Sequence, residues 1–183
     1  MSTAAFLEDQ DFFRFFGIFR NVTLKALPDA HMEDVWFQPV LNQDNSSGKV
    51  SVIMKVTAPE KQNVDARFVL TDREGTVITE KCLQLQGRDG IFTGTIHTDV
   101  QNIKLWDNHS PYLYHACVEL IEEKGGVLEV VPYDIGFRRL EIIDKVIYLN
   151  GKRLVITGVN RHEWNPKTGR CIGMQEMTAD IDC

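Results

Sequence analysis

Two stretches of the chain alternate between apolar and polar positions. In residues 49–57 the apolar set is Val50, Val52, Met54 and Val56, and Ile53 alone breaks the alternation. In residues 64–71, Val64, Ala66, Phe68 and Leu70 alternate with Asp65, Arg67 and Thr71. A period of two places every second side chain on the same face of a strand. Both stretches therefore predict antiparallel strands with one buried face.

Five further runs have the length and composition of strands. They are Met32–Leu41, Val77–Leu85, Ile91–Thr98, Leu113–Glu122 and Val127–Phe137. Turn signals rich in Gly, Asn and Asp separate the runs, at residues 42–48, 72–75, 86–90 and 122–126. Seven short strands at this spacing predict a mainly β fold, a β-sandwich of the immunoglobulin or fibronectin type. Pro39 predicts an edge strand or a bulge in the first of these runs.

The pattern changes after residue 140. Leu140–Ile156 reads as a hairpin, and Asn150-Gly151 fits a type I′ turn because both residues tolerate positive φ. Val155–Val159 then predicts a short apolar strand, and Met174–Cys183 predicts the start of a helix that stops without a breaker. A strand followed by a helix, after a β-sandwich, is how a (β/α) barrel would begin.

The first 26 residues are rich in aromatic side chains. Six phenylalanines lie between Phe6 and Phe19, with acidic residues among them. The run is too short to bury so many rings on its own surface, so we interpret it as the end of a domain whose body lies upstream. Val22, Leu24 and Leu27 predict one strand without a partner, and the exposed aromatic residues 12–19 predict concentration-dependent self-association.

Composition excludes several classes of protein. The 183 residues carry a net charge of −6, which argues against nucleic acid or an anionic membrane as a partner. No apolar run is long enough to cross a bilayer, and the N-terminus lacks the pattern of a secretory signal. The four cysteines show no zinc-ligand spacing, and Cys117 is predicted to be a buried thiol. Reduced thiols suit a cytoplasmic protein.

One cluster of polar residues is a candidate site. Asn160, Arg161, His162 and Glu163 follow an apolar strand pattern where a buried strand would ordinarily turn. The cluster either faces a polar site, as strand ends do in barrel enzymes, or is a hydrogen-bonded corner. Asp9 and Asp11, beside aromatic residues, are either turn caps or ligands of a sugar or a hard cation. The sequence shows no pair of carboxylates suited to acid and base catalysis.

Several motifs, in order along the chain, resemble the large bacterial β-galactosidases of glycoside hydrolase family 2. The motifs are Leu7–Arg14, Gly17–Val22, Asn102 with Lys104–Trp106, Pro111 with Leu113–Tyr114, Gly136–Arg138, Leu149–Lys152 and Gly158–Glu163. Each is weak alone, but together they are specific. The related β-glucuronidases usually carry Asp after the His-Glu pair, whereas Trp164 follows here, so the galactosidase branch fits better.

The resemblance implies an architecture. Residues 1–28 would be the C-terminal end of a sugar-binding jelly-roll domain and residues 29–140 an immunoglobulin-like β-sandwich. Residues 141–183 would be a hairpin and the start of a (β/α)8 catalytic barrel, with its first strand and the start of its first helix. The resemblance also implies that Asp11 contacts the sugar's 6-hydroxyl and a bound sodium ion, and that His162 contacts the galactosyl group. These two are the expected substrate-binding residues, with Asp11 also a metal ligand.

The resemblance implies a function for a longer parent protein. The parent would hydrolyse terminal β-D-galactosides such as lactose with retention, with magnesium and sodium as cofactors, and would form a homo-oligomer. Both catalytic glutamates would lie on later barrel strands, so we expect this chain to carry no catalytic residue and to be inactive alone. The alternative is a non-catalytic immunoglobulin-like interaction or carbohydrate-binding module. In the parent enzyme the sandwich would be a structural or interdomain module, and a third possibility is that it governs assembly.

Overall fold

The computed structural model describes residues 17–18, 20–60, 62–158 and 160–182. By its internal contacts the chain divides into two units. One unit is Ala26–Ile156, and the other combines Met1–Lys25 with Thr157–Cys183. The six phenylalanines from Phe6 to Phe19 lie outside the described residues, so the self-association predicted from the aromatic side chains of residues 12–19 stays a prediction.

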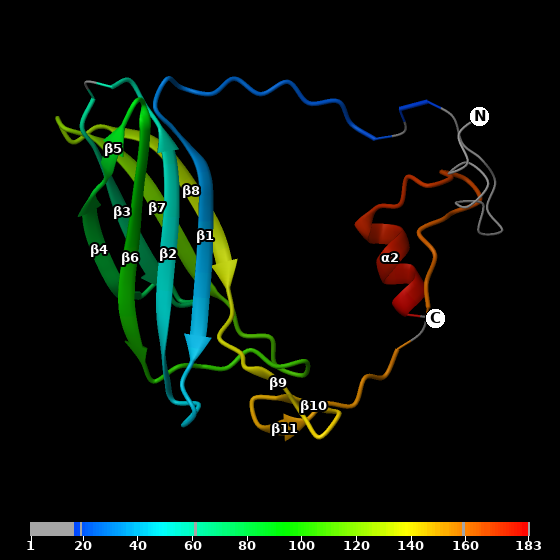
Figure 1. Cartoon of the computed structure of the whole chain (residues 1–183). Coiled ribbons are helices and arrows are strands. Elements are labelled where there is room, and N and C mark those ends of the chain that lie inside the picture. The colour runs from blue at the N-terminus through cyan, green and yellow to red at the C-terminus, as the bar shows by residue number, and fades with distance from the viewer. Residues whose placement is uncertain (1–16, 19, 61, 159, 183) are drawn as a thin grey trace. The chain divides into compact units, whose positions relative to one another are not determined.

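The larger unit contains two four-stranded antiparallel sheets that lie one behind the other (Figure 1). The first sheet has the order β1-β2-β6-β5, with strands His31–Leu41, Ser47–Thr57, Ile91–Gln101 and Gln86–Arg88. The second has the order β4-β3-β7-β8, with strands Val77–Gln84, Val64–Thr71, Tyr114–Glu122 and Val127–Ile135. The seven predicted strands and the predicted sandwich are confirmed. The short strand β5 lies where the sequence indicated a turn.

The predicted alternation places the apolar side chains between the sheets. The buried positions of the central strands are Val50, Val52, Met54 and Val56 of β2, Val64, Ala66, Phe68 and Leu70 of β3, and Tyr114, Ala116, Val118 and Leu120 of β7. Burial of each large apolar side chain contributes about 1.5–3 kcal/mol. Ile53, the exception in the pattern, is on the outer face of β2 opposite Trp36 of β1.

The prediction for Cys117 was wrong. Ala116 and Val118 face the core, so Cys117 between them lies on the outer face of β7 and is only half buried. This partial burial still raises the pKa of its thiol. The alternation of β7 itself, read in register with β3, would have placed Cys117 outside.

The two lateral edges of the sandwich differ in their contacts. On one side the hydroxyls of Thr79 in β4 and Thr98 in β6 are 3.0 Å apart. On the other side β1 and β8 are both edge strands, and each contains a proline, Pro39 and Pro132. Proline lacks the N–H that a central strand must donate, so both positions agree with an edge. The edge-strand prediction for Pro39 is confirmed.

A third, three-stranded sheet follows the sandwich. It has the order β11-β10-β9, with strands Lys152–Arg153, Val146–Leu149 and Leu140–Ile143. We call it the small sheet; it lies at the end of the sandwich where β1 and β8 end (Figure 1). Asn150 and Gly151 join β10 to β11 with φ of 53° and 79°. Positive φ at both residues is what a type I′ turn requires, so the predicted hairpin turn is confirmed.

The second unit contains helix α2, Met174–Ile181, and the predicted helix is confirmed. The carboxylate of Glu176 accepts a hydrogen bond of 3.0 Å from the N–H of the N-cap residue Gly173. The described residues that precede α2 in this unit form turns and coil.

Two strand predictions, one before and one after the sandwich in the sequence, were wrong. Residues 154–158 are coil, with Val155 and Ile156 exposed, and residues 21–28 are coil, with Leu24 99% exposed. An apolar segment becomes a strand only when another strand supplies its hydrogen bonds. Leu154 still donates its N–H to the carbonyl of Ile147 in β10 at 2.8 Å, but among the described residues neither 155–158 nor 21–28 pairs with another strand.

Candidate functional site

Only one of the two predicted substrate-binding residues can be placed. Asp11 lies outside the described residues, so its predicted contacts with a sugar and a sodium ion stay predictions. His162 is exposed and lies in a coil segment of the second unit.

The residues on either side of His162 form ion pairs. Nη2 of Arg161 lies 2.6 Å from a carboxylate oxygen of Asp180 in α2, and Nε of the same side chain lies 2.7 Å from it. Glu163 lies 3.3 Å from Nη2 of Arg20, but both side chains are well exposed, so this pair contributes little. The Arg161 contact fixes one side of the segment to the helix. The polar cluster is thus held by charges rather than by a strand.

A tight turn separates the His162 segment from α2. The N–H of Asn165 donates to the carbonyl of Gly169 at 2.9 Å, and the N–H of Gly169 donates back at 2.8 Å. Gly169 adopts a φ of 65°, a conformation that glycine takes without strain. The indole N–H of Trp164, just before this turn, is buried without a hydrogen-bond partner among the described residues.

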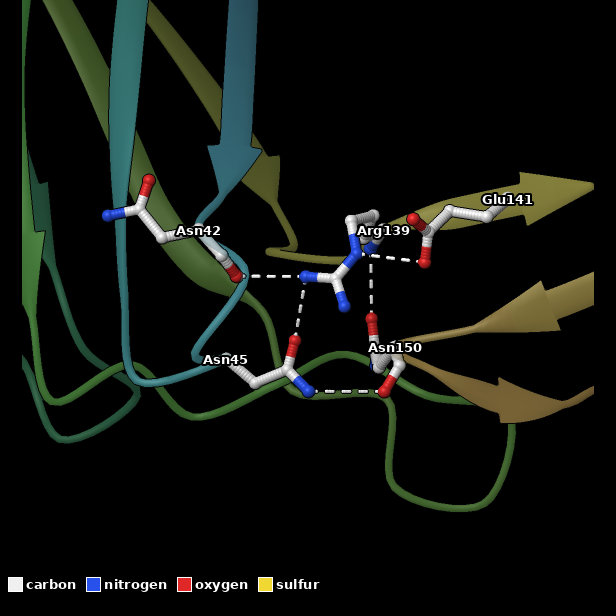
Figure 2. Close-up of polar contacts among 5 residues, drawn as sticks. All are labelled: Asn42, Asn45, Arg139, Glu141 and Asn150. Atoms are coloured by element: carbon white, nitrogen blue, oxygen red, sulfur yellow. Dashed lines mark hydrogen bonds and ion pairs between the residues drawn. The ribbon is translucent and has the colours of Figure 1, made fainter. Parts of the chain in front are cut away.

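A second polar cluster lies within the larger unit, between the sandwich and the small sheet. We call Asn42, Asn45, Arg139, Glu141 and Asn150 the junction network (Figure 2). Nη1 of Arg139 donates to the carbonyl of Asn42 at 2.8 Å and to Oδ1 of Asn45 at 2.9 Å. Its Nε donates to the carboxylate of Glu141 at 3.0 Å. The one guanidinium thus connects the β1–β2 loop with the first strand of the small sheet.

Asn150 is the buried member of the junction network, with 8% of its surface exposed. Its Oδ1 accepts from the N–H of Arg139 at 2.9 Å, and its Nδ2 donates to the carbonyl of Trp106 at 3.0 Å. Its main chain donates to the carbonyl of Arg139 at 2.8 Å and accepts from Nδ2 of Asn45 at 3.1 Å. The two polar side-chain atoms and the two polar main-chain atoms of Asn150 thus each take part in a hydrogen bond.

Three of the motifs quoted above meet at this network. Trp106, Gly136 and Asn150 belong to three different motifs. The hydrogen bond from Asn150 to Trp106 joins residues that are 44 positions apart in the sequence. A Cβ atom on Gly136 would lie 2.9 Å from Cβ of Trp106, so only glycine allows the indole to pack here. The guanidinium of Arg138 lies 4.6 Å from the centre of the Trp106 ring. The motifs therefore mark the junction of the sandwich with the small sheet.

The sequence reasoning missed the roles of Asn45 and Arg139. Asn45 lies in a loop between strands, where polar residues are ordinary, and Arg139 follows the Gly136–Arg138 motif without belonging to it. The available signal was the positive φ that Asn tolerates, since Asn45 has a φ of 59°. That signal indicates a turn but does not indicate the partner of its side chain.

The open edge of the sandwich forms a groove of about 570 Å³ between β1 and β8. Phe37 and Tyr133 stack within it with ring centres 5.3 Å apart, and Trp106 and Arg138 lie at one end. Trp36 and Tyr133 are 58% and 60% exposed. The main-chain N–H of Met32 donates to Glu129 at 2.6 Å and ties the two edges together. The groove is thus aromatic, partly charged and accessible.

A smaller pocket of about 300 Å³ lies beside the junction network, between residues 105–109 and 149–155. Asp107 is among its lining residues and accepts hydrogen bonds from the N–H groups of Ser110 and His109, at 2.7 and 2.8 Å. These two bonds stabilise the ionised carboxylate and lower the pKa of Asp107. The carboxylate of Asp107 therefore stabilises the loop that contains it.

The described part of the chain contains no group of three or more His, Cys, Asp or Glu side chains that could hold a metal ion. The magnesium and sodium implied by the resemblance therefore stay predictions. None of its helices is long and apolar enough to span a bilayer.

Comparison with known families and proteins gives consistent matches. Residues 30–138 match the model of glycosyl hydrolases family 2, and residues 140–183 match the model of that family's TIM barrel domain. The β-galactosidase large subunit of Lactobacillus acidophilus is 44% identical over 99% of this chain, and that of Leuconostoc lactis is 45% identical over 98%. The β-galactosidase of Streptococcus thermophilus is 40% identical over 98%. The chain spans 28% of the length of each large subunit and 17% of the S. thermophilus protein.

Solved structures of the same architecture include β-glucuronidases. The enzyme of Bacteroides uniformis matches 95% of this chain and 22% of its own length, with a TM-score of 0.82 and 22% identity. That of Parabacteroides merdae matches 85% of this chain and 19% of its own, with a TM-score of 0.73 and 23% identity. At this identity the likeness shows the fold alone.

Proposed function

Because the chain belongs to family 2 of the glycosyl hydrolases, we propose that it is part of a β-galactosidase. The whole enzyme hydrolyses terminal β-D-galactose residues of lactose-type β-galactosides, with retention of configuration. The observation that carries this proposal is the identity of 40% or more, over nearly the whole chain, with proteins named β-galactosidase. The solved β-glucuronidases share the architecture at little more than half that identity.

The sandwich and the small sheet have a structural role in this proposal. A retaining glycosidase needs two carboxyl groups about 5–5.5 Å apart. Glu163 lies against Arg20, and Glu176 accepts from the N–H of Gly173. These two carboxylates make local contacts, and both catalytic glutamates are placed in the rest of the enzyme, as the family resemblance implies. The 183-residue chain alone is then inactive.

His162 is the residue of this chain that we assign to the galactosyl group. An imidazole both donates to and accepts from sugar hydroxyls, and its segment is held by the Arg161–Asp180 ion pair. Asp11 is assigned to the 6-hydroxyl and to sodium, as the resemblance implies. Magnesium and sodium are expected in the whole enzyme, which we place in the cytoplasm. Residues 1–28 and 141–183 belong to its jelly-roll and barrel domains.

The name of two of the relatives, large subunit, suggests a partner for the whole protein. We infer that it assembles with a second, smaller chain, and that further copies extend this into the oligomer expected from the family. Copurification of a second chain with the tagged whole protein supports this assembly. If the purified whole protein is a monomer in solution and no second chain copurifies with it, this assembly is contradicted.

The proposed activity is tested by expressing the whole reading frame that encodes this chain and assaying the purified product. The whole purified product should hydrolyse a chromogenic β-galactoside, whereas the 183-residue chain alone should show no turnover above buffer. A whole product without glycosidase activity, in which a second sandwich follows in place of a barrel, would favour the non-catalytic module. Turnover by the 183-residue chain would contradict the absence of catalytic residues.

A further inference from the structure

The turn between β10 and β11 contains the one Asn-Gly pair in the sequence, Asn150-Gly151. In such a pair the main-chain nitrogen of glycine can attack the side-chain amide carbon of asparagine. Glycine has no Cβ to obstruct that approach, so Asn-Gly is the pair at which asparagine loses its amide most readily. The chain thus places its most reactive amide in the junction network.

The structure opposes this reaction while the network is closed. Oδ1 of Asn150 accepts from the N–H of Arg139, and Nδ2 donates to the carbonyl of Trp106. The side chain cannot rotate towards the nitrogen of Gly151 without breaking both bonds. Asn150 is also buried, which keeps out the water that the later step consumes. Deamidation therefore requires the small sheet to open first.

We propose that Asn150 is a deamidation site controlled by the junction network, and that its modification releases the small sheet from the sandwich. The nitrogen of Gly151 forms a bond to Cγ of Asn150, and the bond from Cγ to Nδ2 breaks. Ammonia leaves, with the proton from the Gly151 N–H, and a cyclic imide remains. Water opens this imide to aspartate or isoaspartate, so no oxidant or reductant is needed.

The product does not fit the network. A carboxylate at residue 150 has no N–H to donate to the carbonyl of Trp106, so two acceptors face one another in a buried position. Isoaspartate also adds a carbon to the main chain within the tight turn, where φ values of 53° and 79° are required. Both products therefore keep the junction open, and the change is irreversible. Any effect on the barrel that begins near residue 140 rests on the proposed function.

The rate of the reaction tests the proposed control. The full chain is incubated in mildly alkaline buffer, and deamidation is followed by mass spectrometry of the tryptic peptide Val146–Lys152. Asn150 in the native chain should react at least roughly tenfold more slowly than in the urea-unfolded chain, since only the open state reacts. Arg139→Ala should raise the native rate several-fold, whereas Arg153→Ala, an exposed change in the same sheet, should not. Equal rates in native and unfolded chains would overturn the proposal.

A second measurement tests the consequence. In Asn150→Asp the amides of β10 should lose hydrogen-exchange protection while those of β2 and β7 keep theirs. Protection of the central strands shows that the variant has folded, so the readout stands even if the small sheet is lost. Full protection of β10 in this variant would contradict the release. Neither measurement depends on glycosidase activity.

Discussion

Truncation of Arg139 to alanine removes the side chain that joins the sandwich to the small sheet. The side chain is 16% exposed, and its guanidinium donates to Asn42, Asn45 and Glu141 at 2.8–3.0 Å. The partners come from the β1–β2 loop and from β9. The variant leaves the main-chain bonds between Arg139 and Asn150 in place, so it isolates the side chain.

The expected loss can be worked from these contacts. A hydrogen bond to a charged group contributes about 1.5–3 kcal/mol. The bonds to Asn42 and Asn45 share one nitrogen, and the partly exposed Glu141 regains water when its partner is lost. The full sum is therefore not lost, and we expect Arg139→Ala to lower the free energy of unfolding by roughly 2–4 kcal/mol. Arg139→Lys should lose more than half as much, because one ammonium group cannot reach all three acceptors.

Urea unfolding, followed by tryptophan fluorescence, measures this free energy. Of the three tryptophans, Trp106 packs at the network, so its part of the signal reports the junction. Arg153→Ala is the matched control, since Arg153 is exposed in β11 and should change stability by less than about 0.5 kcal/mol. An Arg139→Ala variant as stable as this control would refute the claim that the guanidinium stabilises the junction.

Three further predictions concern single residues. Gly136→Ala should destabilise the larger unit by about 1–3 kcal/mol, because the added Cβ meets Trp106, whereas Gly158→Ala, with open space around it, should not; equal urea midpoints would contradict this. The pKa of Asp107 is lowered in the folded chain, so its contribution to stability is full above about pH 4 and is lost as the pH falls through the folded value. Asp107→Asn should therefore reduce the acid-induced loss of stability in unfolding curves measured across that range, and an unchanged acid slope would count against the assignment. In the whole enzyme His162→Ala should lower kcat/KM for a galactoside roughly ten- to hundredfold, while Lys167→Ala in the same segment should not; wild-type kinetics for both variants would remove His162 from the site.

The sandwich could be predicted because its signal is local. In β2 and β3 a period of two decides which side chains are buried, and that period is visible in eight consecutive residues. The turn at Asn150-Gly151 could also be predicted, since the two residue types permit positive φ by themselves. Such features depend on neighbours in the sequence rather than on partners elsewhere in the fold.

The junction network could not be predicted for the opposite reason. The side chain of Asn45 donates to the carbonyl of Asn150, 105 positions away, and no local pattern marks either as the partner of the other. Val155 and Ile156 show the same limit, because an apolar run predicts a strand but a strand also needs hydrogen-bond partners. Recognition of the family motifs located the junction without explaining it; the contacts of Trp106, Gly136 and Asn150 supply the reason.

The ratio of kcat/KM for a β-galactoside to that for the corresponding β-glucuronide tests the central claim most directly. The measurement uses the whole purified product of the reading frame, with both sugars on the same chromogenic leaving group. If the chain is part of a β-galactosidase, the galactoside should be preferred by several orders of magnitude, because the carboxylate of Asp11, assigned to the 6-hydroxyl, would repel a carboxylate at the sugar's sixth carbon. A preference for the glucuronide would contradict the account and place the chain with the enzymes that share only its fold.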